Sequence, residues 1–146
     1  MNKIVSLKGY EPLQQTPWSA WYDIKSRWSW YIAPKTVALI PTGVKVALDK
    51  WYVCLVFSRS SLPMKKCLML ANGVGVVDAD YRGEIKVQLY NFWDTEAKID
   101  DLERIWQLVF TRYSDNQFEC DAEMFDTRDE KFPTKRWTGW FGSTSN

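Results

Sequence analysis

The sequence has 146 residues, of which 46% are hydrophobic and 25% are charged, and its formal net charge is +1. This length and composition are typical of one folded domain with its own hydrophobic core, and they exclude a disordered or fibrous chain. A net charge so close to zero excludes a broad basic surface, so we expect neither nucleic acid nor a membrane as a partner.

Short β-type runs recur between turn signals along most of the chain. They cover residues 37–40, 44–48, 51–57, 85–90 and 105–110. Over 85–90 the aliphatic residues alternate with mainly polar ones, which predicts a strand with one buried face. The nearly continuous apolar run over 105–110 predicts a strand that is buried on both faces. The spacing of the runs predicts an all-β sandwich or barrel.

One short helix is predicted over residues 62–70. Ser60 or Ser61 can cap this helix, and Pro63 suits its first turn. No internal repeat is present, and no segment before about residue 114 has the composition of a linker. We therefore predict a single domain that spans residues 1–146.

The last part of the chain differs in character. Residues 114–135 are charged and lack periodicity, and a tail with glycine and hydroxyl residues follows over 136–146. A segment of about twenty residues can extend by roughly 60 Å, at about 3.3 Å per residue. We predict that residues 114–146 form a C-terminal arm that can reach a neighbouring subunit.

Cysteine and histidine usage narrows the possible chemistry. Cys54, Cys67 and Cys120 lie far apart without metal-binding spacing, so we expect buried or incidental thiols. The absence of histidine excludes Ser-His and Cys-His pairs and most zinc sites, so any acid or base must be a carboxylate.

The start of the chain lacks the apolar core of a signal peptide, and we expect a cytoplasmic location.

Residues 72–89, NGVGVVDADYRGEIKVQL, combine several charged residues with closely spaced glycines. Asp78, Asp80, Arg82 and Glu84 fall within seven positions around Tyr81. Glycine and aspartate are also common in ordinary β-hairpin loops. Composition alone therefore does not decide whether this segment is a plain hairpin or a functional site.

This segment resembles the signature motif of the dUTP pyrophosphatase (dUTPase) family, which reads approximately N-G-V-G-V-I-D-x-D-Y-R-G-E. Segments similar to the other family motifs follow in order: AWYDI at 20–24, SRSSL at 58–62, ERIWQLVF at 103–110 and RWTGWFGSTS at 136–145. The resemblance implies a jelly-roll-like β-barrel with a short helix and a C-terminal arm. It also implies a homotrimer in which several subunits build each active site.

For the central motif the resemblance implies hydrolysis of dUTP to dUMP and pyrophosphate. Asp78 would activate a water molecule for attack on the α-phosphorus. Asn72 and the hairpin backbone around Gly75 and Val77 would read the uracil edge. Tyr81 would pack under the deoxyribose and exclude a ribose 2′-hydroxyl. The alternative for Asp78 is a turn aspartate that bonds to its own backbone.

The resemblance places phosphate contacts and a metal near the second, fourth and first motifs. Arg59, Ser60 and Ser61 would contact phosphate, with a helix cap as their alternative. Gln107 would also contact phosphate, or else face solvent from a strand. Asp23 would lie near Mg²⁺ and act through water, or else occupy a surface turn. The ion itself would be carried mainly by the triphosphate.

The tail would complete the site. By the resemblance Arg136 would meet the γ-phosphate, Phe141 would stack on uracil, and Gly142, Ser143 and Thr144 would wrap the phosphates. The tail lacks the spacing of a Walker P-loop, and without the other motifs it is typical of a disordered terminus.

The sequence departs from the family by placing bulky residues where the family usually has glycine. These residues are Trp18, Trp21, Trp51, Cys54, Cys67, Leu102, Trp137 and Trp140, and Trp106 replaces a small residue. They favour an alternative function, a dUTPase-fold protein that binds a nucleotide or a protein partner with weak or no turnover. Asp78, Tyr81, Arg136 and Ser143 favour the hydrolase. The related dCTP deaminase is a further alternative, against which the dUTPase-like tail argues.

Overall fold

The computed structural model describes residues 2–6, 11 and 13–114, and the structural statements below concern these residues. The strands are β1 (Lys3–Ser6), β2 (Leu13–Gln14), β3 (Tyr22–Lys25), β4 (Trp30–Ile32), β5 (Val37–Pro41), β6 (Val44–Ala47), β7 (Tyr52–Ser58), β8 (Leu68–Leu70), β9 (Gly75–Val77), β10 (Lys86–Asn91), β11 (Ala97–Ile99) and β12 (Arg104–Arg112), and the helix is α1 (Ser61–Lys66). Apart from Ser114, the predicted arm lies outside the described residues, together with Cys120, Trp137 and Trp140.

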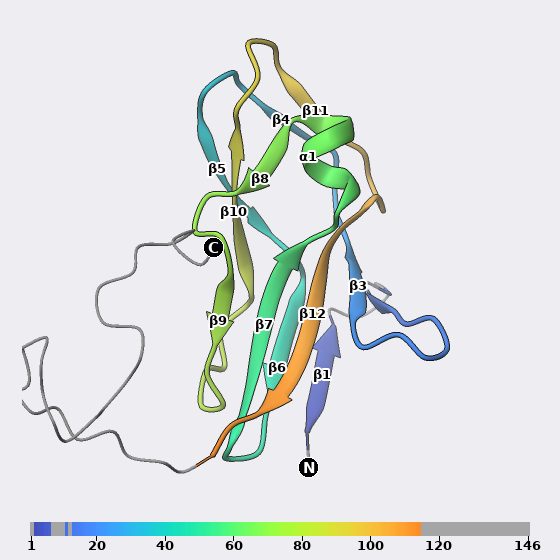
Figure 1. Ribbon diagram of the computed structural model, residues 1–146, viewed down its shortest axis with the longest axis vertical. Coiled ribbons are helices and arrows are strands. Elements are labelled where there is room, and N and C mark those ends of the chain that lie inside the picture. The colour runs from blue at the N-terminus through green and yellow to red at the C-terminus, as the bar shows by residue number, and fades with distance from the viewer. Residues whose placement is uncertain (1, 7–10, 12, 115–146) are drawn as a thin grey trace, which may run out of the picture. The chain divides into compact units, whose positions relative to one another are not determined.

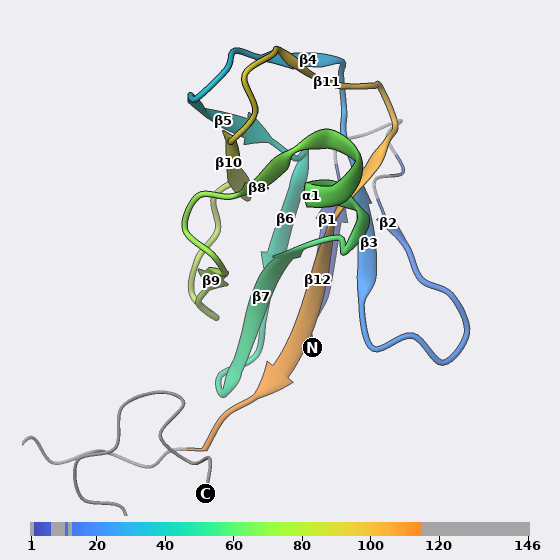
Figure 2. The ribbon, with the colours of Figure 1, turned by 45° about the horizontal axis from the view of Figure 1, so that its top comes forward.

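The strands form antiparallel sheets that share one hydrophobic core. A five-stranded sheet has the order β2-β3-β12-β7-β9, a three-stranded sheet has the order β5-β10-β8, and β1-β6 and β11-β4 form two-stranded sheets. Figures 1 and 2 show β7 beside β12, with α1 following β7 at the end of the sheet near β8. This arrangement is the predicted all-β, jelly-roll architecture.

Strand burial follows the predicted patterns. In β10 Val87 and Leu89 are buried whereas Lys86 and Gln88 are exposed, so this strand has one buried face. In β12 every residue from Ile105 to Phe110 is at least half-buried. The consecutive burial of Ile105 and Trp106 coincides with a register shift between Arg104 and Trp106. Such a bulge turns successive side chains toward the same interior.

The predicted helix over 62–70 is wrong in its second half. The helix ends at Lys66 because Cys67 adopts a left-handed conformation with φ 54°, and the Cys67 N–H donates to Pro63 O at 3.2 Å. Residues Leu68–Leu70 form β8 and pair with β10. The expected cap is also missing, since the Ser60 side chain makes no capping hydrogen bond.

The bulky residues at the family's glycine positions fall into two groups. Trp18, Trp51, Cys67 and Leu102 have φ of 67°, 75°, 54° and 57°, in the region that favours glycine. Trp21 and Cys54 are not among the residues with positive φ. Cys54 is completely buried, and burial raises the pKa of its thiol to about 12, so this thiol stays protonated and unreactive at neutral pH.

Within the described part of the chain, no helix is long and apolar enough to cross a membrane.

Candidate functional site

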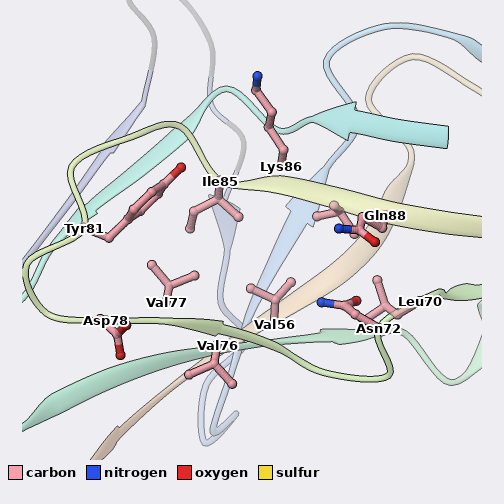
Figure 3. Close-up of a pocket in the computed structure, with 12 residues that line it drawn as sticks. Val56, Leu70, Asn72, Val76, Val77, Asp78, Tyr81, Ile85, Lys86 and Gln88 are labelled. Carbon is pink, nitrogen blue, oxygen red and sulfur yellow. The ribbon is translucent and has the colours of Figure 1, made fainter.

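A pocket of about 230 Å³ opens within the 72–89 segment, between its first arm, which contains β9, and its second arm, which contains β10. In the described residues β9 pairs with β7, whereas β10 pairs with β5 and β8, so the two arms belong to different sheets. The pocket is lined by Val56, Leu70, Asn72, Gly75, Val76, Val77, Asp78, Tyr81, Ile85, Lys86, Val87 and Gln88. The segment is therefore a splayed hairpin with space for a ligand between its arms (Figure 3).

The pocket has apolar walls and polar groups at its rim. Figure 3 shows the side chain of Val77 directed toward the opposite arm, whereas the Asp78 carboxylate points to the other side of β9. Asn72 and Gln88 place amide groups at the end of the pocket remote from Tyr81. Because an edge strand carries unpaired N–H and C=O groups, β9 can offer donors and acceptors to a planar ligand.

Gly75 lets the floor of the pocket lie close to β7. A Cβ atom on Gly75 would lie 3.1 Å from Val56 Cβ, which is tighter than ordinary packing allows. The same atom would lie 3.9 Å from Asn72 Nδ2, so Asn72 lies over the glycine. A larger residue at position 75 would require Val56 to give way by a few tenths of an ångström.

A second cluster joins residues from the first, second and fourth motifs. Asp23 Oδ1 lies 3.5 Å from Arg59 Nε and accepts a hydrogen bond from Gln107 Nε2 at 3.2 Å. Asp23 Oδ2 lies 3.7 Å from Arg104 Nη1. The cluster forms because β12 lies between β3 and β7, with Gln107 opposite both Asp23 and Phe57.

Asp23 is 8% exposed and lies in a strand, not in the surface turn considered as its alternative. Likewise, Gln107 is half-buried and bonded to Asp23 and does not simply face solvent. A buried carboxylate needs partners to offset its lost hydration, and the two arginines and the amide supply them. The cluster therefore holds the Asp23 carboxylate between two guanidinium groups and an amide.

Arg59 is held by its backbone as well as by its side chain. The Arg59 N–H donates to Ile105 O at 2.9 Å, and Arg59 Nη1 donates to Arg104 O at 3.3 Å. Ser60 is exposed and Ser61 is half-buried at the start of α1. The structure therefore positions Arg59 firmly beside two serines whose hydroxyls lie near the helix start.

The pocket lining and the Asp23 cluster have no residue in common. The structure thus brings Asn72, Gly75, Val77, Asp78 and Tyr81 together in one place, and Asp23, Arg59 and Gln107 together in another. The remaining site residues expected from the sequence, Arg136, Phe141, Gly142, Ser143 and Thr144, lie outside the described residues. Sequence reasoning missed Lys86 and Gln88, although their alternation on a strand next to the motif could have indicated them. It also missed Arg104.

Replacing Asp23 with alanine is expected to destabilise the fold by about 1–3 kcal/mol, because two arginines and an amide lose their common partner. The exposure of Arg59 and Arg104, at 30% and 41% of their side chains, keeps the loss below that of a fully buried pair. Urea unfolding measures the change. A matched Asp101→Ala variant, at an exposed position, is expected to stay within about 0.5 kcal/mol of wild type.

The architecture and the splayed hairpin define an antiparallel jelly-roll protein with a pocket suited to a planar polar ligand. The family model for dUTPase matches residues 9–144. The chain is 37% identical over 139 residues to the deoxyuridine 5′-triphosphate nucleotidohydrolase of Lactococcus lactis, with 91% of this chain and 86% of the relative covered. It is 40% identical over 116 residues to the enzyme of the same name from Escherichia phage T5, with 79% and 73% covered. The chain belongs to the dUTPase family.

Solved structures agree with this assignment. The crystal structure of dUTPase from Streptococcus mutans matches with a TM-score of 0.72 and 32% identity, covering 79% of this chain and 98% of that one. The Staphylococcus bacteriophage 80alpha dUTPase with dUPNHPP matches with a TM-score of 0.82, covering 100% and 99% of the two chains. At 22% identity this second likeness concerns the fold.

Proposed function

We propose that this protein hydrolyses dUTP to dUMP and pyrophosphate, and so acts in nucleotide metabolism. The observation that carries the proposal is the pocket between β9 and β10, built by the motif that most closely resembles the family signature. Membership of the dUTPase family over residues 9–144 supports it.

The pocket suits a uracil base. One edge of uracil presents an N–H donor between two carbonyl acceptors, so it needs an alternating set of acceptors and donors. The free edge of β9 and the Asn72 amide provide groups of both kinds, and the apolar walls exclude water from the ring faces. Tyr81, on the loop that joins β9 to β10 (Figure 3), would pack against the deoxyribose.

Asp78 would act on the phosphate side of the bound nucleotide. Asp78 lies at the pocket directly after β9, and its carboxylate points to the opposite side of the backbone from Val77, so it would not compete with the base (Figure 3). Asp78 would take a proton from a water molecule as the water oxygen bonds to the α-phosphorus. The bond from this phosphorus to the bridging oxygen breaks, and pyrophosphate leaves with the electron pair.

Arg59, Ser60, Ser61 and Gln107 would contact the phosphates. Because they do not line the pocket in one chain, we propose that a neighbouring subunit of a homotrimer supplies them. The arm, with Arg136, Phe141 and the Gly142–Ser143–Thr144 run, would close the same site. The shared site and the single-domain organisation over 1–146 remain predictions, as does the cytoplasmic location.

Mg²⁺ fits this chain as an ion bound to the triphosphate. The described residues contain no group of three or more acidic, cysteine or histidine side chains that could hold a metal. Both Asp23 oxygens already face arginines, so Asp23 can accept a hydrogen bond from a metal-bound water more readily than it can bind the ion itself. When bound, the ion would neutralise charge on the phosphates.

The proposal is tested by incubating the purified protein with magnesium and dUTP, dCTP, dTTP or UTP, and by measuring pyrophosphate and monophosphate. Preferential turnover of dUTP is expected. Turnover no higher than that of an Asp78→Asn variant would overturn hydrolysis and leave the nucleotide-binding alternative. Formation of dUTP from dCTP would instead indicate a deaminase.

Light scattering tests the shared site. A trimer of the 17.2 kDa chain is expected. A monomer with full activity would contradict the assignment of Arg59 and Gln107 to a neighbouring subunit.

A further inference from the structure

The start of β10 is bound to the turn between β5 and β6. Thr42 donates to Ile85 O through both its backbone N–H, at 3.2 Å, and its Oγ1 hydroxyl, at 2.7 Å. In return the Ile85 N–H donates to Val44 O at 2.9 Å. Thr42 and Ile85 are buried, so these bonds fix the end of the splayed hairpin to the core.

Glu84 adds a charged bond to the same turn. Gly43 has φ 72°, and its N–H donates to Glu84 Oε1 at 2.7 Å. Gly43 is buried, so its N–H would lose its partner if the carboxylate were removed. A bond from a backbone N–H to a carboxylate is stronger than one between neutral groups. Glu84 therefore anchors the loop between β9 and β10 to the β5–β6 turn.

Glu84 also holds Tyr81. The Tyr81 hydroxyl donates to Glu84 O at 3.0 Å, and the ring lies against Gly83. A Cβ atom on Gly83 would overlap the Tyr81 hydroxyl and lie 2.6 Å from ring atom Cζ, so a larger residue at position 83 would force the ring to shift. Figure 3 shows this ring reaching from the loop toward the arm that leads to Ile85.

The rest of the loop is bonded to itself. Arg82 Nη1 donates to Ala79 O at 2.6 Å and to Tyr81 O at 3.0 Å, and the Tyr81 N–H donates to Asp78 O at 3.2 Å. These bonds tie the residues between Asp78 and Arg82 to one another. A displacement at Glu84 would therefore move Tyr81 and its neighbours together.

We propose that Glu84 is a positioning residue for substrate selection: its carboxylate, held by the Gly43 N–H, places Tyr81 where its ring discriminates deoxyribose from ribose. This inference rests on the proposed function, because it concerns the sugar of a nucleotide bound in the same pocket. Glu84 touches no reacting atom and acts through Tyr81.

The test compares kcat/KM for dUTP and UTP in Glu84→Ala, Glu84→Asp and Glu84→Gln variants. In the alanine variant we expect the preference for dUTP over UTP to fall about tenfold or more, since a specificity contact loses its support. The aspartate is one methylene too short to reach Gly43 and is expected to lose preference as well. Glutamine keeps an acceptor oxygen at the same reach and is expected to retain the preference within about threefold.

The ratio of kcat/KM for dUTP to kcat/KM for UTP separates positioning from a loss of folded protein, because misfolding lowers activity on both substrates equally. Thermal melting of each variant accompanies the kinetics, and if the alanine variant does not fold, the aspartate and glutamine variants carry the comparison. The same preference for dUTP in the Glu84→Ala and Glu84→Asp variants as in Glu84→Gln would overturn the inference. A wild-type protein without preference for dUTP would instead overturn the proposed function.

Discussion

Replacing Asp78 with asparagine is expected to lower kcat for dUTP hydrolysis by about 10²- to 10⁴-fold, the range typical of a lost general base. Asparagine has nearly the same shape as aspartate but cannot take the proton from water. Binding should change by no more than a few-fold, because the carboxylate points away from the pocket wall that would hold the base (Figure 3). Steady-state kinetics measures the first quantity, and calorimetry with a non-hydrolysable dUTP analogue measures the second.

The matched control is Asp80→Asn, which removes the same charge two residues further along the loop. Asp80 is exposed and lies outside the pocket lining. Its replacement is expected to leave kcat within about threefold of wild type, since a surface charge in solvent is well screened. A full loss of kcat in Asp80→Asn, or a near-normal kcat in Asp78→Asn, would contradict the assignment of Asp78 as the general base and favour its alternative, a turn aspartate.

The strands that could be predicted were those with enough residues to show a pattern. The runs over 37–40 and 85–90 reappear as β5 and β10 because alternation or β-branched residues mark a strand by themselves. β8 and β9 have three residues each, and they are strands because β10 and β7 pair with them. Pairing with neighbouring strands determines these two elements. The helix predicted over 62–70 extended too far because its second half pairs with β10 as β8.

The residues of the proposed site could be named from motifs, but the geometry that relates them could not. Motif matches named Asp23 and Gln107, yet they lie 84 positions apart and meet only through the register of β3 and β12. The bond between Gly43 and Glu84 spans 41 positions and follows from no motif spacing. The division of the site residues between a pocket and a separate cluster likewise depends on which sheet each strand joins.

Replacing Trp18 with glycine is expected to raise the free energy of unfolding by about 1 kcal/mol. A left-handed backbone costs a non-glycine residue roughly 1–2 kcal/mol, and the greater freedom of glycine in the unfolded chain offsets roughly 0.5–1 kcal/mol of that relief. Trp18 is fully exposed at φ 67°, so its removal forfeits no packing. Leu102, exposed at φ 57°, should respond similarly, whereas Trp51 also packs against Tyr113 and should gain less. Thermal and urea unfolding measure the change, with a rise of about 4 °C in Tm for each kcal/mol.

Two controls separate backbone strain from the loss of an exposed indole. Trp18→Ala keeps a Cβ atom and therefore the strain, and Trp21→Gly acts at a position without positive φ, so neither should stabilise the fold. Equal gains from the alanine and glycine variants at position 18 would show that the indole itself, and not φ, is the cause. Turnover of dUTP in the stabilised variants then distinguishes the two functional alternatives. If these substitutions only reduce stability, glycine should increase the amount of folded enzyme and leave kcat unchanged, whereas a chain adapted to weak turnover should stay slow after its stability is restored.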